Sequence, residues 1–322
     1  MIDQEKENSM SYPFKNLIFE GGGVKGVAYG GALDVLDDRG ILGQIVRVGG
    51  TSAGAITAAL VALGYDAAAI KSKMLNLNFN EFKDGSFLRD FKNLFEKYGW
   101  YKGDIFLRYI EGEIAHMTGN PHATFNDLHA RGFKDLYVIS TDLTLRQYQV
   151  FSHESKGETR VADAVRMSMS IPLFFASYKF ENNVFVDGGV LNNYPITLFD
   201  DPKYNKDLSP GSPNPETLGF VLSKQVIEPY KISDMEQYMG NLFETILDLQ
   251  DDALWNDEEN LRRTVCINNL GIQTTDFNIS MEQRQALIKK GHEATANYLR
   301  AYDAGVRPTV CDNRKRDRRR DV

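Results

Sequence analysis

The chain has 322 residues and an apolar content of 42%, enough for one large buried core or two smaller ones. Its formal charge of −7 is uneven: the last ten residues, NRKRDRRRDV, carry a net charge of +4, which leaves −11 on the preceding 312. An acidic body argues against nucleic-acid binding, because phosphate contacts need clustered Lys and Arg on the folded surface.

Cysteine use and apolar runs indicate the compartment. Cysteine occurs only at Cys266 and Cys311, which predicts no disulfide framework and favours a reducing compartment. The N-terminus MIDQEKENSMSYPF lacks the apolar core of a secretory signal. The longest apolar stretch, from Ala53, is shorter than the about 20 residues that span a bilayer. We therefore expect a cytoplasmic protein that meets membranes only at their surface.

Strand and helix patterns alternate along the chain. Short apolar runs predict strands, and the periodic segments between them predict helices. The predicted strands and helices are, in order, strand 16–19, helix 24–38, strand 45–49, helix 53–63, strands 136–141 and 146–152, helix 161–169, hairpin 178–189 with Asn182 and Asn183 at its turn, strand 218–223, helix 232–255, strand 264–268 and helix 281–303. This alternation favours an α/β fold with a mainly parallel sheet covered by helices on both faces.

We expect a single domain over residues 14–303, followed by a basic, disordered tail at 304–322. The tail could add attraction to an anionic membrane or act only as a solubilising end. Residues 200–217 hold four of the ten prolines and predict a long surface loop. Such a loop can act as a lid, although a plain connection is the simpler expectation.

The stretch FEGGGVKGVAYGGALDVL, residues 19–36, places a glycine loop between a predicted strand and a predicted helix. Gly21, Gly23 and Gly26 have the GxGxxG spacing of a dinucleotide-binding turn. Converging backbone N–H groups at a helix N-terminus would serve equally well to bind an oxyanion formed during acyl transfer. The loop alone leaves both interpretations open.

A second glycine cluster favours the oxyanion. The strand at 45–49 leads into GTSAG, residues 50–54, and then into an apolar helix, which is the context of a GxSxG nucleophile elbow. Ser52 is the candidate nucleophile, and the alternative is an ordinary serine N-cap. A dinucleotide site would need an acidic residue at the end of the second strand, where VRVG stands. A P-loop would need a Lys-Ser/Thr pair, which GGGVKG lacks.

The base is less obvious than the nucleophile. An α/β-hydrolase triad would end in a late histidine, and His292 lies in an amphipathic helix with no motif around it, which favours a solvated side chain. Asp187 follows the strand VFV and precedes two glycines, so its carboxylate would lie at a strand end with space around it. The alternative for Asp187 is a turn aspartate, since Asp-Gly is a common turn pair.

Four motifs in this order resemble the patatin-like phospholipases: GGGVKG at 21–26, GTSAG at 50–54, SIP at 170–172 and DGG at 187–189. They extend over residues 16 to 200, with a C-terminal extension at 201–303 whose segment RRTVCINNLGIQTTDFNIS also resembles bacterial members. The resemblance implies a three-layer patatin-type sandwich with a mainly parallel central sheet. It implies a serine acyl hydrolase, of phospholipase A or lysophospholipase type, that uses neither metal nor cofactor.

The resemblance also assigns roles to residues. Ser52 would attack the acyl carbonyl, Asp187 would act as base and then acid, and the amides of Gly22, Gly23 and Val24 would bind the oxyanion. The loop and the supporting motif positions comprise Gly21, Gly22, Gly23, Val24, Lys25 and Gly26, with Gly50, Gly54, Pro172, Gly188 and Gly189. The expected partner is a phospholipid or lysophospholipid at a membrane surface, and a homodimer stays open. A catalytically silent lipid-binding protein is the alternative function.

Two features near the predicted chemistry allow two interpretations each. Lys25 could steer a phosphate headgroup or offset developing negative charge, or it could be a solvated residue at a helix start. The aromatic-rich segment 79–104, with Phe87, Phe91 and Phe95 at helical spacing, could be a cap that touches the bilayer. A packed amphipathic helix is the more common origin of such a stripe.

Overall fold

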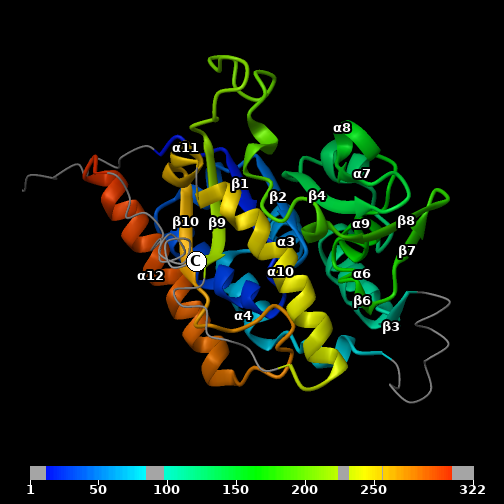
Figure 1. The fold of residues 1–322 in the computed structure, drawn as a ribbon. Helices are drawn as coiled ribbons and strands as arrows, with labels where there is room; N and C mark the ends of the chain where they lie inside the picture. The colour runs from blue at the N-terminus through cyan, green and yellow to red at the C-terminus, as the bar shows by residue number, and fades with distance from the viewer. Residues whose placement is uncertain (1–11, 85–97, 224–231, 256, 307–322) are drawn as a thin grey trace, which may run out of the picture.

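The computed structural model describes residues 12–84, 98–223, 232–255 and 257–306, with only the backbone described for 251–255 (Figure 1). In this part of the chain an eight-stranded sheet has the order β10-β9-β1-β2-β4-β8-β7, and β5 pairs with β4. Its strands are β1 (Asn16–Phe19), β2 (Arg47–Thr51), β4 (Asp135–Asp142), β5 (Gln147–Phe151), β7 (Tyr178–Phe180), β8 (Asn183–Asp187), β9 (Thr217–Ser223) and β10 (Thr264–Asn268). A separate parallel pair joins β3 (Gly99–Tyr101) to β6 (Leu173–Phe175).

Strand direction decides where the sequence motifs meet. β10, β9, β1, β2 and β4 are parallel, so the segments that follow β1 and β2 leave the same edge of the sheet. β8 is antiparallel to β4, and its last residue, Asp187, pairs with Ser140. The neighbouring residue of β4, Ile139, pairs with Thr51 at the end of β2. The ends of β2 and β8 therefore converge on the same point of β4.

Helices flank the sheet as the alternating pattern predicts. The remaining elements are η1 (Gly23–Ala28), α1 (Tyr29–Asp38), α2 (Ile41–Gln44), α3 (Ala53–Ala62), α4 (Ala67–Asn76), η2 (Phe79–Phe82), α6 (Asp104–Thr118), α7 (Phe125–Ala130), α8 (His153–Lys156), α9 (Val161–Ser168), η3 (Gly188–Val190), η4 (Ile196–Phe199), α10 (Met235–Trp255), α11 (Glu258–Arg262) and α12 (Met281–Asp303). Most of the core lies on the face covered by α3, α9 and α12, with α1 between α4 and α12. On the opposite face, Ile18 and Tyr137 pack against η4.

The structure corrects several sequence predictions. The predicted helix 24–38 is a 3-10 helix, η1, that continues as α1. The hairpin turn is one residue earlier than predicted, because Phe180 pairs with Asn183 and the positive φ angles lie at Glu181 and Asn182. The prediction omitted α4, α6, α7 and the β3–β6 pair. The predicted aromatic stripe at 87, 91 and 95 lies outside the described residues.

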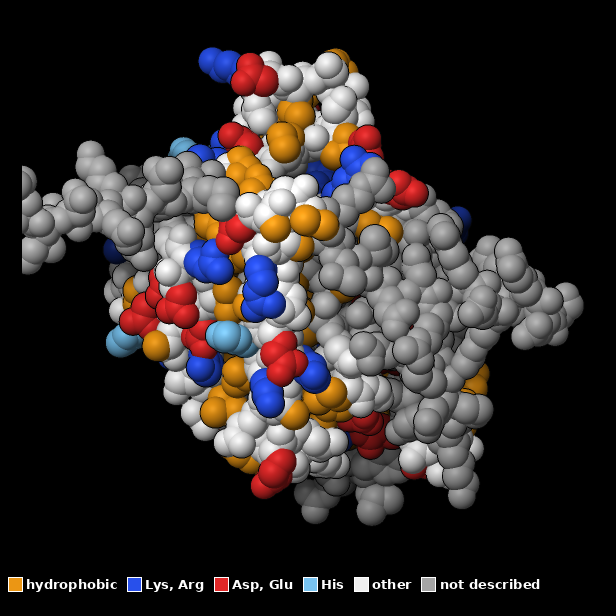
Figure 2. Space-filling model, turned by 90° about the vertical axis from the view of Figure 1, so that its left-hand side faces the viewer, with side chains coloured by type: hydrophobic (Ala, Val, Ile, Leu, Met, Phe, Trp, Pro, Cys, Tyr) orange, Lys and Arg blue, Asp and Glu red, His pale blue; other side chains and the backbone are white. Residues whose placement is uncertain are grey.

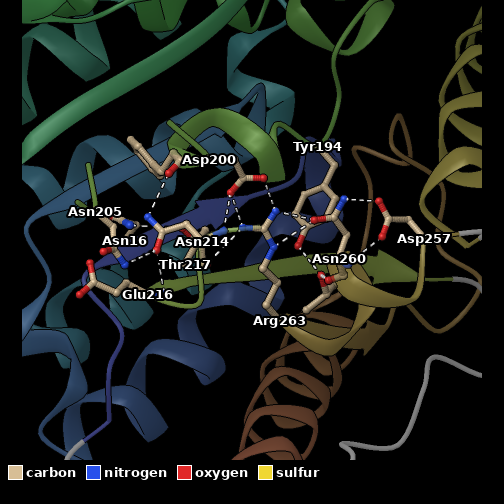
Figure 3. Close-up of polar contacts among 12 residues, drawn as sticks. Asn16, Tyr194, Asp200, Asn205, Asn214, Glu216, Thr217, Asp257, Asn260 and Arg263 are labelled. Atoms are coloured by element: carbon tan, nitrogen blue, oxygen red, sulfur yellow. Dashed lines mark hydrogen bonds and ion pairs between the residues drawn. The ribbon is translucent and has the colours of Figure 1, made fainter. Parts of the chain in front are cut away.

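The proline-rich loop 200–217 is a plain connection tied to the core. Arg263 donates to both carboxylate oxygens of Asp200, at 2.5 and 2.6 Å, and to the carbonyl oxygen of Asn214 (Figure 3). Asn260 accepts from the same guanidinium. Thr217 pairs with the first residue of β1, so this buried polar cluster lies at the amino ends of β1 and β9. The glycine loop begins at the other, carboxyl end of β1, so the cluster and the loop lie at opposite ends of the strands.

The long helix α12 covers one side of the molecule, and that side carries interspersed charges of both signs (Figure 2). His292 is exposed on α12, in agreement with the solvated side chain expected for it. Among the described helices, none is sufficiently long and apolar to cross a membrane. The tail prediction concerns residues that lie mostly outside the described part of the chain.

The structure bears on the compartment inferred from the cysteine content. Cys266 on β10 is disulfide-bonded, and the only other cysteine in the sequence, Cys311, lies outside the described residues. Two cysteines are too few for a disulfide framework but enough for one bond. The cysteine content therefore no longer supports a reducing compartment.

Candidate active site

Ser52 occupies a strained turn between β2 and α3. Its backbone has φ 54° and ψ −124°, a combination that residues other than glycine rarely adopt. Its N–H donates to Ser168 Oγ at 2.9 Å, which holds the turn against the end of α9. The residue is 2% exposed and lies at the N-terminus of α3, where the helix dipole favours negative charge. This is the geometry of a nucleophile elbow.

The glycines on either side of Ser52 allow this turn. A Cβ atom at Gly50 would overlap the carbonyl group of Gly54. A Cβ atom at Gly54 would overlap the carbonyl oxygens of Phe19 and Glu20, so α3 packs directly on the end of β1. Backbone atoms cannot move aside as a flexible side chain can. The small residues that the motif predicts are therefore required by packing.

Asp187 ends β8 and is completely buried. Its N–H donates to the carbonyl oxygen of Ser170 at 2.8 Å, and its Oδ1 accepts from the N–H of Gly189 at 2.7 Å. Oδ2 has no hydrogen-bond partner. A buried carboxylate oxygen without a donor is costly for stability, and such groups concentrate at functional sites.

Burial raises the pKa of the Asp187 carboxyl to about 7, against the lowering effects of the Ser52 hydroxyl and the Gly189 N–H. The hydroxyl of Ser52 is therefore close enough to interact with this carboxyl. In this structure the hydroxyl donates instead to Met169 Sδ, at 3.6 Å. A thioether sulfur is a weak hydrogen-bond acceptor. Rotation of the hydroxyl towards Asp187 Oδ2 would therefore replace the Met169 sulfur with a stronger acceptor. The two predicted residues are brought together.

The glycine loop lies beside Ser52. A Cβ atom at Gly21 would be 3.2 Å from Ser52 Cβ, and one at Gly26 would be 2.8 Å from Ala53 Cβ. Among the hydrogen bonds of the described residues, none uses the N–H of Gly22 or Gly23. The N–H of Val24 donates to the carbonyl oxygen of Thr274 at 3.3 Å. Of the three predicted amides, Gly22 and Gly23 are thus the available donors.

Lys25 is not the solvated residue that one interpretation of its position expects, and the structure leaves its effect on developing charge untested. It is 4% exposed, and its Nζ pairs with Glu244 Oε1 of α10 at 3.4 Å. A buried, paired ammonium is neither solvated nor open to a headgroup in this conformation.

The remaining motif positions support the carboxylate. Gly188 and Gly189 begin η3, and a Cβ atom at Gly188 would overlap the carbonyl oxygen of Ile139. Pro172 follows α9, as a helix-stopping residue should. Ser170 Oγ accepts from Arg166 Nη1 at 2.5 Å, so it has a structural partner and no elbow of its own.

Sequence reasoning missed several residues that hold the site. Arg166 is buried and also donates to the carbonyl oxygens of Lys102, Gly103 and Ala176. Gln250 of α10 donates to the carbonyl oxygen of Gly189 at 2.6 Å. Neither residue belongs to a motif. Asn193, which donates to Glu20 Oε1, stands six residues after Asp187, and its nearness to DGG is the one available signal.

One group of the described residues has the composition of a metal site. Ligand atoms of His129, Asp135 and His153 lie within 4.8 Å of one another. The two imidazole rings are stacked, with centroids 3.9 Å apart and planes 5° from parallel. Ring lone pairs lie in the ring plane, so two stacked rings cannot both aim at one ion between them. Asp135 begins β4, at the amino end of that strand, so the group does not belong to the site around Ser52.

Comparisons of the sequence and the fold show which known proteins this chain is similar to. Residues 17–200 match the family model described as patatin-like phospholipase. The chain is 30% identical over 305 residues to the uncharacterized protein YqhO of Bacillus subtilis, which covers 88% of this chain and 98% of YqhO. It is 26% identical over 236 residues to the probable lipid hydrolase 463L of invertebrate iridescent virus 6, covering 71% of this chain and 78% of 463L.

The fold also resembles that of VipD from Legionella pneumophila. The TM-score is 0.62 at 19% identity, and the match covers 90% of this chain and 67% of VipD. The family model spans more than half of the chain, and it includes the elbow, the glycine loop and the buried aspartate. The chain belongs to the patatin-like phospholipase family.

Proposed function

We propose that this protein is a serine acyl hydrolase that cleaves fatty acyl esters of phospholipids or lysophospholipids at a membrane surface. The observation that carries the proposal is the closeness of Ser52, on its strained elbow, to the buried carboxylate of Asp187, one oxygen of which has no hydrogen-bond partner. Membership of a family of lipid hydrolases, and the similarity to the probable lipid hydrolase 463L, support the substrate class.

In the proposed reaction, ionised Asp187 accepts the proton of the Ser52 hydroxyl as Oγ attacks the acyl carbonyl. The negative charge that develops on the carbonyl oxygen is stabilised by the N–H groups of Gly22 and Gly23 and by the N-terminus of α3. Asp187 then gives the proton to the departing alcohol, and an acyl group remains on Ser52. Water, deprotonated by Asp187, releases the fatty acid and restores the serine.

The burial of Asp187 is what makes a carboxylate an adequate base. A carboxyl of ordinary pKa near 4 would accept a proton from an alcohol only rarely. A pKa of about 7 brings the carboxyl into the range where it is still ionised at neutral pH yet accepts a proton more readily. The same burial excludes water and strengthens each charge interaction in the site.

Contact with a lipid surface is part of the proposal. Helix α10 contacts the loop after Asp187 through Gln250. Its outer surface exposes apolar side chains at spacings of three, four and seven residues, namely Met235, Tyr238, Leu242 and Leu249. Exposed apolar rows of this kind are typical of surfaces that meet lipid or protein. The homodimer considered from the sequence stays a prediction.

The test is release of fatty acid from vesicles of a two-chain phospholipid and from lysophospholipid micelles. Wild type should turn over, and Ser52→Ala and Asp187→Asn should fall to background. Two exposed positions provide matched controls, Ser209→Ala and Asp207→Asn, which should keep wild-type rates. Hydrolysis that persists in Ser52→Ala would refute the mechanism, and lipid binding without turnover would favour the silent lipid-binding alternative.

A further inference from the structure

Glu244, on the buried side of α10, connects to the glycine loop by two routes. It is 5% exposed, and its Oε1 accepts from Lys25 Nζ at 3.4 Å. The same oxygen accepts from the N–H of Thr274 at 2.5 Å. Lys25 belongs to the loop itself, and Thr274 lies in the segment after β10. Glu244 is thus the point where α10, the glycine loop and this segment meet.

Thr274 forms the second route. Its carbonyl oxygen accepts from the N–H of Val24 at 3.3 Å. Gly23 has φ +54° and lies so close to Thr274 that a Cβ atom would overlap the same carbonyl oxygen. Thr274 therefore holds the backbone around the Gly22 and Gly23 amides in place. The carboxylate of Glu244 in turn accepts from the N–H of Thr274.

Burial makes the carboxylate important in both routes. Lys25 and Glu244 have side chains that are only 5% and 6% exposed. Removing one charge of a buried pair leaves the other without compensation, which is much more costly than losing an exposed pair. A lone Lys25 ammonium would have to move towards water, and the loop that carries it would move as well.

We infer that Glu244 is a positioning residue for the oxyanion site, which holds the glycine loop in place through Lys25 and Thr274. This rests on the proposed function. It assigns Lys25 a role in placing the loop rather than in binding a headgroup. Because catalysis is sensitive to displacements of about 1 Å and because one oxyanion donor is worth about 100- to 1,000-fold in rate, a loosened loop should cost mainly kcat.

The experiment compares Glu244→Gln with the matched control Glu236→Gln, a partly exposed carboxylate on the same helix that pairs with Lys83. With a soluble p-nitrophenyl ester, Glu244→Gln should lower kcat about 10- to 100-fold with little change in KM. The apparent pKa of the rate should stay as in wild type, because Asp187 is untouched. Glu236→Gln should match wild type in every measurement.

The double variant Lys25→Met/Glu244→Gln separates positioning from direct catalysis. Met fills the buried space without a charge, so the double variant should recover part of the activity lost in Glu244→Gln. If the Lys25 charge instead stabilised the transition state directly, the double variant would be no better than the single one, and the inference would be wrong.

Hydrogen exchange provides a measurement that does not depend on turnover. Peptides that cover residues 20–28 should exchange faster in Glu244→Gln than in wild type, while peptides of α12 should be unchanged. Wild-type kcat together with unchanged exchange at 20–28 would overturn the inference. If instead Ser52→Ala hydrolyses as fast as wild type, the proposed function fails, and the exchange result alone still decides the role of Glu244.

Discussion

Asp187 is held by Ser170 through the main chain: the N–H of Asp187 donates to the carbonyl oxygen of Ser170 at 2.8 Å. Ser170 is in turn held by the buried guanidinium of Arg166, whose pKa burial lowers to about 10. The end of α9 and the residues after it thus fix both catalytic candidates, since Ser168, the last residue of α9, accepts from the backbone N–H of Ser52.

Replacing Arg166 should displace Asp187 as well as destabilise the fold. Arg166→Lys cannot satisfy every oxygen that the guanidinium now contacts, and each buried acceptor left without a donor costs about 1–3 kcal/mol. We expect a lower melting temperature and a reduced kcat. The control is Arg160→Lys at the start of the same helix, a partly exposed ion pair worth at most about 1 kcal/mol. Equal effects of the two variants would contradict this role for Arg166.

The pKa of Asp187 predicts how the rate depends on pH. Burial raises this pKa to about 7, and the ionised form is the one that accepts the serine proton. We expect kcat/KM for a soluble ester to rise about tenfold per pH unit below pH 7 and to level off above it. Steady-state rates over about pH 5 to 9 would show this. A profile flat across that range would mean that the group titrating in catalysis is not this carboxyl.

The same raised pKa should make stability fall with pH. The unfolded carboxyl has a pKa near its ordinary value of 3.8, so the protonated carboxyl stabilises the fold fully below that pH. This contribution is lost between pH 3.8 and about 7, to a total on the order of 4 kcal/mol. Asp187→Asn cannot ionise, so its unfolding free energy relative to wild type should increase from pH 4 to pH 8. A difference independent of pH would show that the carboxyl is not shifted.

Glycine at position 54 should be essential for the elbow. Gly54→Ala places a methyl group against two carbonyl oxygens, and overpacking of this kind costs about 1–3 kcal/mol. The shift of α3 should also reduce activity at temperatures where the variant remains folded. Gly43→Ala is the matched control, since nothing lies within 4 Å of its Cβ position in α2. Denaturant unfolding and ester hydrolysis of both variants would show whether only Gly54 matters.

The Arg263–Asp200 pair should affect stability without affecting the chemistry. Asp200→Asn leaves a buried guanidinium with reduced compensation, which typically costs about 3–5 kcal/mol. Because the pair lies at the amino ends of β1 and β9, the kcat of the folded variant should equal that of wild type. The exposed neighbour Asp201→Asn should change neither quantity. A lowered kcat in folded Asp200→Asn would mean that this cluster is coupled to the site.

The sequence predicts the local geometry of the glycine loop, the turn at Ser52 and the strand end at Asp187, because each depends on neighbouring residues. A strand, a tight turn and a helix follow one another around Ser52, and the small residues beside it are those that the strained turn requires. The alternating pattern likewise predicts the α/β sheet. The hairpin register was missed by one residue because Glu181 and Asn182 both take positive φ angles, and a glutamate at such a position has no sequence signal.

Long-range contacts explain what sequence could not predict. Lys25 and Glu244 are 219 residues apart, so nothing near Lys25 indicates that its charge is buried and paired. The same holds for Arg166, whose acceptors are backbone carbonyls that any residue could provide. Sequence motifs thus predict positions such as Ser52 and Asp187. They do not predict the distant side chains, such as Glu244 and Arg166, that hold those segments in place.

The most direct test of the central claim is the site of covalent modification by a fluorophosphonate. Peptide mapping after brief exposure at pH 8 should find the adduct on Ser52 alone, with slower labelling in Asp187→Asn and none in Ser52→Ala. An adduct on another residue, or labelling of Ser52→Ala at the wild-type rate, would contradict the assignment of Ser52 as nucleophile and Asp187 as its base.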